Sequence, residues 1–389
     1  MTASTRTIAG LSVAHLVTDL YGPALPAIIS LLILRSGYSY LAAGLLVTVY
    51  NAVSSLAQPG IGWIHDRKGM HLPPSLSILV CGLFISLLGL GPGFGVMLLF
   101  CGIAALGHAA FHPVALSLTG RQSTDANRGR VISYFVVGGN LGFALGPLAA
   151  GVAIEVLGQG GILIMALPAL AMALALPVLL PPFFRLPPAV TGIGELGGTA
   201  QVAWKPVAVL VAAASLRAMV IFGAIAYLPT LLAGKGFDLL TANSLLTLML
   251  LVGVAGQVLG GAVSDRSGRK ETILAGMAAT AVFLAGFLVL PGTGGLLCLM
   301  LFGFALWSSF SVTLAIAHEL LPGNLGLASG LLLGLSMGFG GLGVALIGGI
   351  ADALGLAAAF WALLVITLLA IPFFIVLPYP WRGRNTSLR

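Results

Sequence analysis

The residues best suited to chemistry in this chain lie inside long apolar stretches. His15 and Asp19 are four residues apart in the stretch 8–33, and His108 and His112 are four residues apart in 95–119. Residues with this spacing share one face of a helix. Imidazole changes its charge near neutral pH, and ionisable groups in apolar helices often serve ion or proton pathways. The spacing therefore predicts that both pairs carry protons or contact a charged substrate.

Asp19 is the only acid well inside any apolar stretch. We predict that it is a protonation switch whose partner is His15 or Arg217. The alternative is a permanent salt bridge that fixes the packing of helices. Gly22 and Pro23 follow Asp19 closely and, together with Pro26, predict a break or bend in this helix.

His108 and His112 form the second pair. When charged they would attract an anionic substrate such as a phosphonate or carboxylate, and His112 is also a candidate proton carrier. Structural hydrogen bonding and metal binding are the alternatives. A zinc peptidase motif would need a glutamate directly after His108, where the chain has Ala109 followed by Ala110, so a buried peptidase is not expected.

Arg217 is the only basic residue inside a predicted span. Its planar guanidinium suits the oxygens of a phosphonate. We predict that it binds substrate, pairs with Asp19 or does each in turn, and a structural arginine is the alternative. The uncharged residues predicted to line the substrate cavity are Asn51, Gln58, Asn140, Trp307 and Ser311. Helix packing is the alternative role for each of them.

Composition indicates where these residues lie. Of the 389 residues, 59% are hydrophobic and 7% are charged, whereas soluble domains carry about 25% charged residues. So few charges cannot keep the surface of a water-soluble globule wetted. A cytosolic enzyme, a nucleic-acid-binding protein and a disordered chain are therefore excluded. We expect an all-α polytopic membrane protein, and no enzyme, because the chain has no nucleophile–base motif.

Twelve apolar segments are long enough to span a membrane as helices. They are predicted at 8–33, 41–64, 73–91, 95–119, 130–156, 160–181, 206–233, 240–264, 271–291, 294–320, 325–353 and 356–378. The predicted organisation is an N-terminal six-helix bundle at 1–181, a Pro- and Gly-rich cytoplasmic linker at 182–205 and a C-terminal six-helix bundle at 206–389. Nothing in the sequence indicates an obligate oligomer, so we expect a monomer.

Lys and Arg predict the orientation in the membrane. Of the 17 such residues, all but Arg35, Lys235 and the intramembrane Arg217 are predicted on one side. Because cytoplasmic loops are enriched in Lys and Arg, both termini and the linker are expected in the cytoplasm. The expected location is the inner membrane of a bacterium or archaeon.

The two halves repeat at an offset of 199 residues. QPGIGWIHDRKG at 58–69 matches QVLGGAVSDRSG at 257–268, and Phe111 matches Phe310. Such repeats place a substrate site between the halves, near the middle of the bilayer. We predict cytoplasmic charge clamps that gate the halves, with membrane anchoring as the alternative. The predicted gating residues are Asp66, Arg67, Gly69, Asp265, Arg266, Gly268 and Arg269.

The duplicated G-x-x-x-D-R-x-G pattern in these repeats resembles the major facilitator superfamily. The G-x-x-x-G-P core at 142–147 resembles the antiporter motif of its drug exporters, and close helix packing is the alternative. The strings AHLVTDLY at 14–21, LGHAAFHP at 106–113 and VGGNLGFALGP at 137–147 are similar to the fosmidomycin resistance family. Val114 departs from that family, which often carries an acid after the His-Pro pair.

The resemblance implies a major facilitator fold and drug resistance by efflux. The expected function is alternating-access export of a small anionic or amphiphilic compound, such as a phosphonate antibiotic, in exchange for protons. The proton gradient is the energy source, and no cofactor is expected. The expected partners are the substrate, protons and the lipid bilayer. The alternatives are a proton-coupled uptake symporter of an organic anion and a divalent-metal exporter that uses the intramembrane His and Asp residues.

Overall fold

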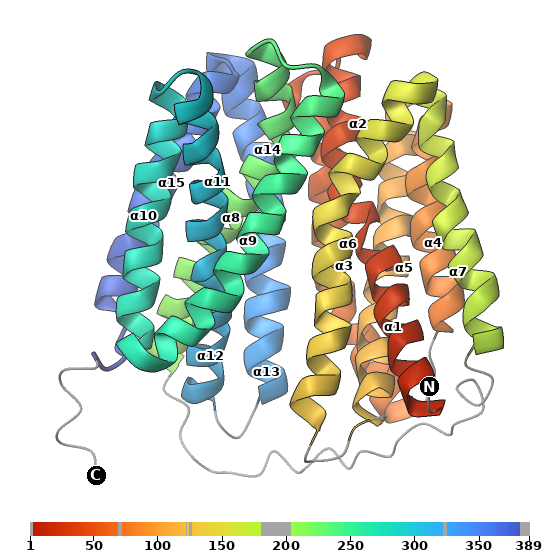
Figure 1. The fold of residues 1–389 in the computed structure, drawn as a ribbon, viewed down its shortest axis with the longest axis horizontal. Helices are drawn as coiled ribbons and strands as arrows, with labels where there is room; N and C mark the ends of the chain where they lie inside the picture. The colour runs from red at the N-terminus through yellow and green to blue at the C-terminus, as the bar shows by residue number, and fades with distance from the viewer. Residues whose placement is uncertain are drawn as a thin grey trace. The chain divides into compact units, whose positions relative to one another are not determined.

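The chain is built from helices. A computed structural model describes residues 3–68, 72–121, 123, 127–179, 204–321 and 325–381. No β-strand occurs among these residues, as Figure 1 shows. The prediction of an all-α protein is therefore confirmed.

The first half of the sequence forms a series of mostly long helices. Their bounds are α1 (Ala3–Asp19), α2 (Tyr21–Ser36), α3 (Tyr40–Lys68), α4 (Pro74–Ser86), η1 (Leu87–Leu90), α5 (Phe94–Arg121), α6 (Arg128–Leu157), η2 (Gly158–Met165) and α7 (Ala166–Leu179).

The second half continues in the same way. Its helices are α8 (Trp204–Gly234), α9 (Leu239–Ser267), α10 (Arg269–Val289), α11 (Gly292–Ser308), α12 (Phe310–Leu320), α13 (Leu325–Ser329), the π-helix η4 (Gly330–Ser336), α14 (Met337–Leu354) and α15 (Leu356–Val376).

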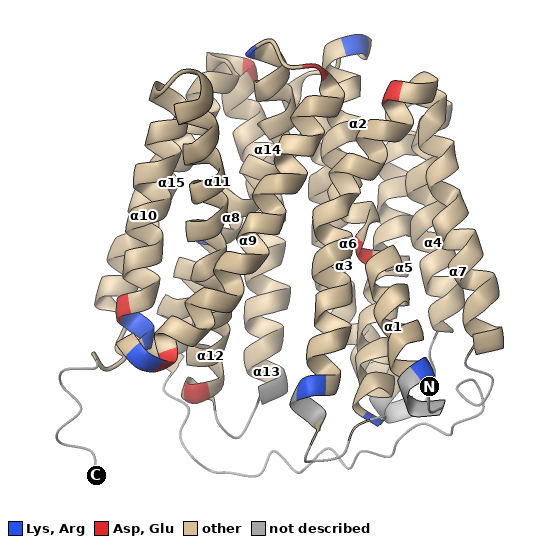
Figure 2. Cartoon of the chain, in the orientation of Figure 1, with Lys and Arg blue, Asp and Glu red and all other residues tan. Residues whose placement is uncertain are grey.

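The helices have the length and composition of membrane spans. Ten helical stretches of the described chain are long and apolar enough to cross a membrane. One of them, Arg130–Leu179, has 50 residues and contains both α6 and α7, while a shorter apolar helix covers Pro74–Leu90. Over its described residues, each of the twelve predicted spans coincides with helical structure. Figure 2 shows the charged residues mainly near helix ends, as expected for a polytopic membrane protein.

The chain divides into two compact units. The first unit contains the described residues of 1–38, 42–192 and 228–247, and the second contains those of 39–41, 193–227 and 248–389. The end of α8 and the start of α9 thus group with the first unit. The predicted linker 182–205 lies outside the described residues except for its last two positions, which begin α8.

A helix break positions Asp19. Helix α1 ends at Asp19, and α2 begins at Tyr21 within the same apolar stretch, Arg6–Ser36. Pro23 explains the break, because it has no backbone N–H to bond the Asp19 carbonyl four residues earlier. The predicted break is confirmed, and it places the carboxylate at a helix end near the middle of the apolar stretch.

Glycines of α6 allow α1 to pack closely against it. A Cβ atom added to Gly138 or Gly142 would lie only 2.2 or 2.0 Å from a backbone carbonyl oxygen of α1, and one added to Gly146 only 2.4 Å from the carbonyl oxygen just after α1. These glycines are spaced four residues apart, so they form one stripe along α6. Two of them belong to the G-x-x-x-G-P core. That motif therefore has a packing role in this chain, as in other small-residue helix interfaces of membranes.

A buried lysine closes the end of the last helix. The Lys270 Nζ donates hydrogen bonds to the carbonyl oxygens of Ile375 at 2.7 Å and Leu377 at 2.8 Å, and it lies 4.6 Å from the Trp381 ring centroid. The last carbonyls of a helix have no partner within the helix. Lys270 supplies donors for two carbonyls at the end of α15.

We expect Lys270→Met to lower the free energy of unfolding by about 1–3 kcal/mol, because it leaves buried carbonyls without a donor. Thermal unfolding in detergent measures the change. Lys205→Met is the matched control, since Lys205 is exposed in the first turn of α8. Equal melting temperatures for the two variants would contradict the role assigned to Lys270.

Candidate proton and substrate site

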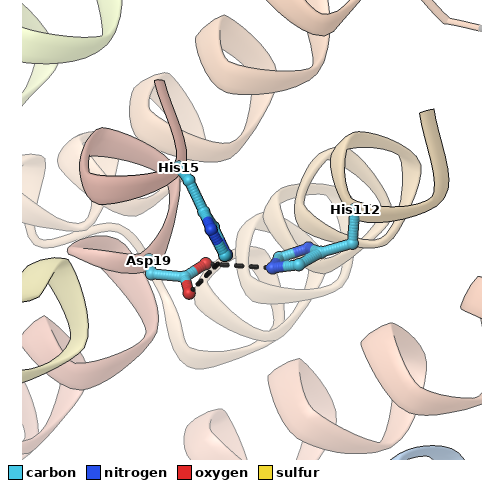
Figure 3. Close-up of side chains that lie close together, drawn as sticks. All are labelled: His15, Asp19 and His112. Atoms are coloured by element: carbon cyan, nitrogen blue, oxygen red, sulfur yellow. Dashed lines mark ion pairs between the residues drawn. The ribbon is translucent and has the colours of Figure 1, made fainter. Parts of the chain in front are cut away.

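Four ionisable side chains converge between α1 and α5. Asp19 Oδ2 lies 3.1 Å from His15 Nε2, and Asp19 Oδ1 lies 3.1 Å from His112 Nε2 and 3.4 Å from His108 Nε2. Figure 3 shows His15 and His112 pointing toward the carboxylate from opposite helices. The structure thus brings together both pairs that the sequence singled out. We refer to these four residues as the Asp19 cluster.

His15 is the most tightly packed member of the cluster. Its Nδ1 lies 2.8 Å from the carbonyl oxygen of Phe135 on α6, and its ring stacks on that of Phe135 with centroids 4.0 Å apart. The Phe111 ring lies on another side, with a centroid distance of 5.9 Å. These contacts hold the imidazole in one orientation, with Nε2 directed at Asp19.

His112 is held by its own helix. Its Nδ1 lies 3.0 Å from the carbonyl oxygen of His108, one turn earlier on α5. Its side chain is 24% exposed, compared with 9% for that of His15. His112 is therefore the member of the cluster with the best access to solvent, and Pro113 follows it within the helix.

His108 belongs to a polar chain that starts on α3. The Gln58 amide donates to the Ser54 hydroxyl oxygen at 3.3 Å, and the Ser54 Oγ lies 2.8 Å from His108 Nδ1. Gln58 was predicted to face the substrate cavity, whereas Ser54 was not predicted. Asn51, another predicted cavity residue, donates to the Val47 carbonyl of its own helix.

Gly139 of α6 lies directly against the side chains of His15 and Asp19. A Cβ atom added there would lie 2.4 Å from His15 Cε1 and 2.7 Å from Asp19 Oδ2. Only glycine leaves room for both side chains in this orientation. Asn140, which follows it and was predicted to line the cavity, is half-buried.

The donor atoms of His15, Asp19 and His112 lie within 4.8 Å of one another. This spacing suits a set of shared protons, and it is also short enough for a metal ion. Both hypotheses from the sequence are thus compatible with the geometry.

Arg217 of α8 has neutral partners in the second unit. It is 2% exposed, and its guanidinium donates to the hydroxyl oxygens of Ser309 at 3.2 Å and Thr313 at 3.1 Å. The guanidinium carbon lies 5.3 Å from the Phe310 ring centroid. Among the described residues of this unit Arg217 makes no ion pair, and its Nε has no hydrogen-bond partner. An unneutralised, buried guanidinium is suited to an anionic ligand.

Trp307 and Ser311 contact α9. The Ser311 hydroxyl donates to the Gln257 carbonyl at 3.0 Å, and the Trp307 indole packs where a Cβ on Gly253 would clash at 2.6 Å. These contacts agree with helix packing, which was the alternative to a substrate-binding role for both residues.

Two predicted gating residues of the second half, Asp265 and Arg269, belong to a charge cluster. Arg269 Nη1 lies 3.2 Å from Asp265 Oδ1, and Arg269 Nε donates to Glu319, which also accepts from the Tyr379 hydroxyl. Burial and the bond to Glu319 raise the pKa of Tyr379 above its ordinary range. Glu319 and Tyr379 were not predicted, although an acid near a helix end facing basic loops is a usable signal.

The other predicted gating residues have simpler positions. Arg266 is exposed, and Gly268 precedes α10 with φ of 100°, a conformation that favours glycine. Asp66 and Arg67 lie in the last turn of α3, where their side chains are not described. Gly69 lies outside the described residues.

Comparisons with known proteins agree on one family. The family model described as Major Facilitator Superfamily matches residues 7–333 and 236–389. The fosmidomycin resistance protein of Escherichia coli (strain K12) is 32% identical over 366 residues, which cover 89% of this chain and 86% of that protein. The uncharacterized MFS-type transporter YfnC of Bacillus subtilis (strain 168) is 30% identical over 388 residues, covering 94% and 91%.

Solved structures share the fold. A bacterial homologue of the human lysosomal transporter Spinster superposes with a TM-score of 0.81 at 18% identity and covers 95% of this chain and 96% of its own. A D-xylose–proton symporter superposes with a TM-score of 0.76 at 13% identity, covering 98% and 100%.

We expect Gly139→Ala to lower the free energy of unfolding by about 1–3 kcal/mol, because the added methyl group displaces His15 and Asp19. Thermal unfolding in detergent tests this. Gly60→Ala is the control, since a Cβ atom on that α3 residue meets no atom within 4 Å. An unchanged stability of Gly139→Ala would mean that the cluster tolerates displacement and that Gly139 does not position it.

Proposed function

Because the chain belongs to the major facilitator superfamily and is a membrane transporter, we propose that it exports a small anionic compound in exchange for protons. The observation that carries this proposal is the Asp19 cluster. A carboxylate within 3.4 Å of three imidazole nitrogens, inside apolar helices, is a group that can take up and release protons near neutral pH.

The substrate class is inferred from Arg217. The residue is buried and has only hydroxyl partners among the described residues of its unit, so an anionic ligand would supply the missing counter-charge. A guanidinium fork matches the oxygens of a phosphonate or carboxylate. The similarity to a fosmidomycin resistance protein supports a phosphonate antibiotic as the first compound to test.

In the proposed cycle, the outward-open transporter takes up protons at the Asp19 cluster and releases the substrate. The protein then opens toward the cytoplasm, where the protons leave and the next substrate binds at Arg217. The charge cluster of Asp265, Arg269 and Glu319 is proposed to open and close with each cycle. No cofactor is required, since the proton gradient supplies the free energy.

The orientation is also part of the proposal. Lys and Arg are concentrated in the loops predicted on one side, which supports an inner-membrane location with both termini in the cytoplasm. We propose a monomer as the working unit, because each chain carries its own proton and anion sites.

The decisive experiment is fosmidomycin efflux from proteoliposomes energised by a proton gradient. We expect proton-driven efflux by the wild type and efflux at the level of protein-free liposomes for Asp19→Asn, because asparagine cannot exchange a proton. Asp238→Asn is the matched control. Asp238 is an exposed acid that bonds Thr241 at the start of α9, and asparagine preserves that cap, so wild-type rates are expected.

Other outcomes identify other mechanisms. Unchanged efflux by Asp19→Asn would contradict coupling through Asp19. Uptake instead of efflux in vesicles of known orientation would establish a symporter. Calorimetric binding of zinc, nickel or iron, lost in Asp19→Asn, would favour a divalent-metal exporter, which the close donor atoms of the cluster also suit.

A further inference from the structure

The hydrogen bonds around the Asp19 cluster determine where its histidines carry their protons. A backbone carbonyl can only accept a hydrogen bond, so an imidazole nitrogen that bonds to one must carry hydrogen. His15 Nδ1 faces the Phe135 carbonyl at 2.8 Å, and His112 Nδ1 faces the His108 carbonyl at 3.0 Å. In their neutral forms both histidines are therefore Nδ1–H tautomers, and each Nε2 presents a lone pair.

Both Nε2 atoms lie close to the carboxylate, whose buried Oδ1 atom has no hydrogen-bond partner among the described residues. His15 Nε2 lies 3.1 Å from Asp19 Oδ2, and His112 Nε2 lies 3.1 Å from Asp19 Oδ1. An ionised carboxylate has only acceptor atoms. Without a proton between them, the Nε2 lone pair and the carboxylate oxygen of each contact repel each other. When one proton binds between the two atoms, the contact becomes a charge-assisted hydrogen bond. The two contacts use different carboxylate oxygens, so they can be filled together.

His108 has the opposite tautomer. The Gln58 amide donates a hydrogen bond to the Ser54 oxygen at 3.3 Å. Among the described residues, the acceptor for the hydrogen of the Ser54 hydroxyl is His108 Nδ1, at 2.8 Å. His108 Nδ1 then accepts, and its Nε2 carries hydrogen directed at Asp19 Oδ1 at 3.4 Å. His108 can therefore face the carboxylate as a neutral donor without an added proton.

We infer that the Asp19 cluster stores two exchangeable protons, one between each carboxylate oxygen and the Nε2 of His15 or His112. His108 is a positioning residue whose neutral Nε2–H form is set by Ser54. The inference rests on the proposed proton coupling. It adds the number of protons that the cluster stores and the atoms that hold them. The cluster changes its net charge by two units between the empty and the filled state.

The surroundings contain few other titratable groups. From α3 the Tyr50 ring lies 5.5 Å from that of His108, and its hydroxyl contacts Cys81 of α4 at 3.6 Å. Phenols and thiols ordinarily titrate above pH 8. From α6 the cluster is contacted by the Phe135 carbonyl and by Gly139. The titratable groups that the described neighbouring elements bring close to the cluster are thus a phenol and a thiol.

The test counts protons without substrate or gradient. The full-length protein in weakly buffered detergent is titrated from pH 8 to pH 5, and the uptake of each variant is subtracted from that of the wild type. We expect His15→Gln and His112→Gln each to take up about one proton fewer, and the double variant about two fewer. His108→Gln is the matched control and should take up as many protons as the wild type. A deficit of one proton in His108→Gln, or none in His112→Gln, overturns the inference.

Nitrogen NMR provides a second measurement. It uses only the wild-type protein, so it does not depend on the folding of any variant. With ¹⁵N-labelled histidine at pH 8, His15 and His112 should give Nδ1–H tautomer shifts and His108 Nε2–H shifts. Three identical tautomers in the cluster overturn the inference. If the proton count holds but proton-driven efflux fails, only the proposed function is wrong. Proton-driven efflux with a single exchangeable proton would refute only the two-proton cluster.

Discussion

The carboxylate of Asp19, held inside apolar helices, is the constraint on which the first unit depends. An isolated charge there costs several kcal/mol, so it persists only with partners that satisfy it. Three imidazole nitrogens lie within 3.4 Å of it, and those of His15 and His112 satisfy it only when a proton occupies the contact. The same contacts join α1 to α5, so the proposed proton exchange would act directly on the packing of these two helices.

The close approach of α6 to α1 makes this arrangement possible. The glycine stripe of α6 admits the α1 backbone, Gly139 leaves room for His15 and Asp19, and the Phe135 carbonyl sets the tautomer of His15. The G-x-x-x-G-P motif, which resembles that of antiporters, thus contributes here by allowing close helix packing. This packing helps to bring the Phe135 carbonyl within hydrogen-bond distance of the His15 imidazole. Packing and proton chemistry are two consequences of the same helix contact.

The sequence predicted the helices and the two residue pairs, but neither the meeting of His108 and His112 with Asp19 nor the protonation pattern. Apolar length predicted the spans, and spacing of four residues paired His15 with Asp19 and His108 with His112. The tautomers depend on the Phe135 carbonyl and the Ser54 hydroxyl, and no residue pattern encodes a backbone acceptor on a distant helix. Glu319 and Tyr379 were missed for a related reason, because they meet Arg269 only after the chain folds.

The two halves use one scaffold with opposite charge. Phe111 and Phe310 occupy matching repeat positions, and each lies against an ionisable site: Phe111 against His15 at 5.9 Å, and Phe310 against Arg217 at 5.3 Å. A permanent cation with hydroxyl partners cannot exchange a proton near neutral pH, whereas a carboxylate among imidazoles can. The sites beside these two matching phenylalanines thus differ in chemistry, which supports the proposed division of roles: proton exchange in the first half and anion recognition in the second.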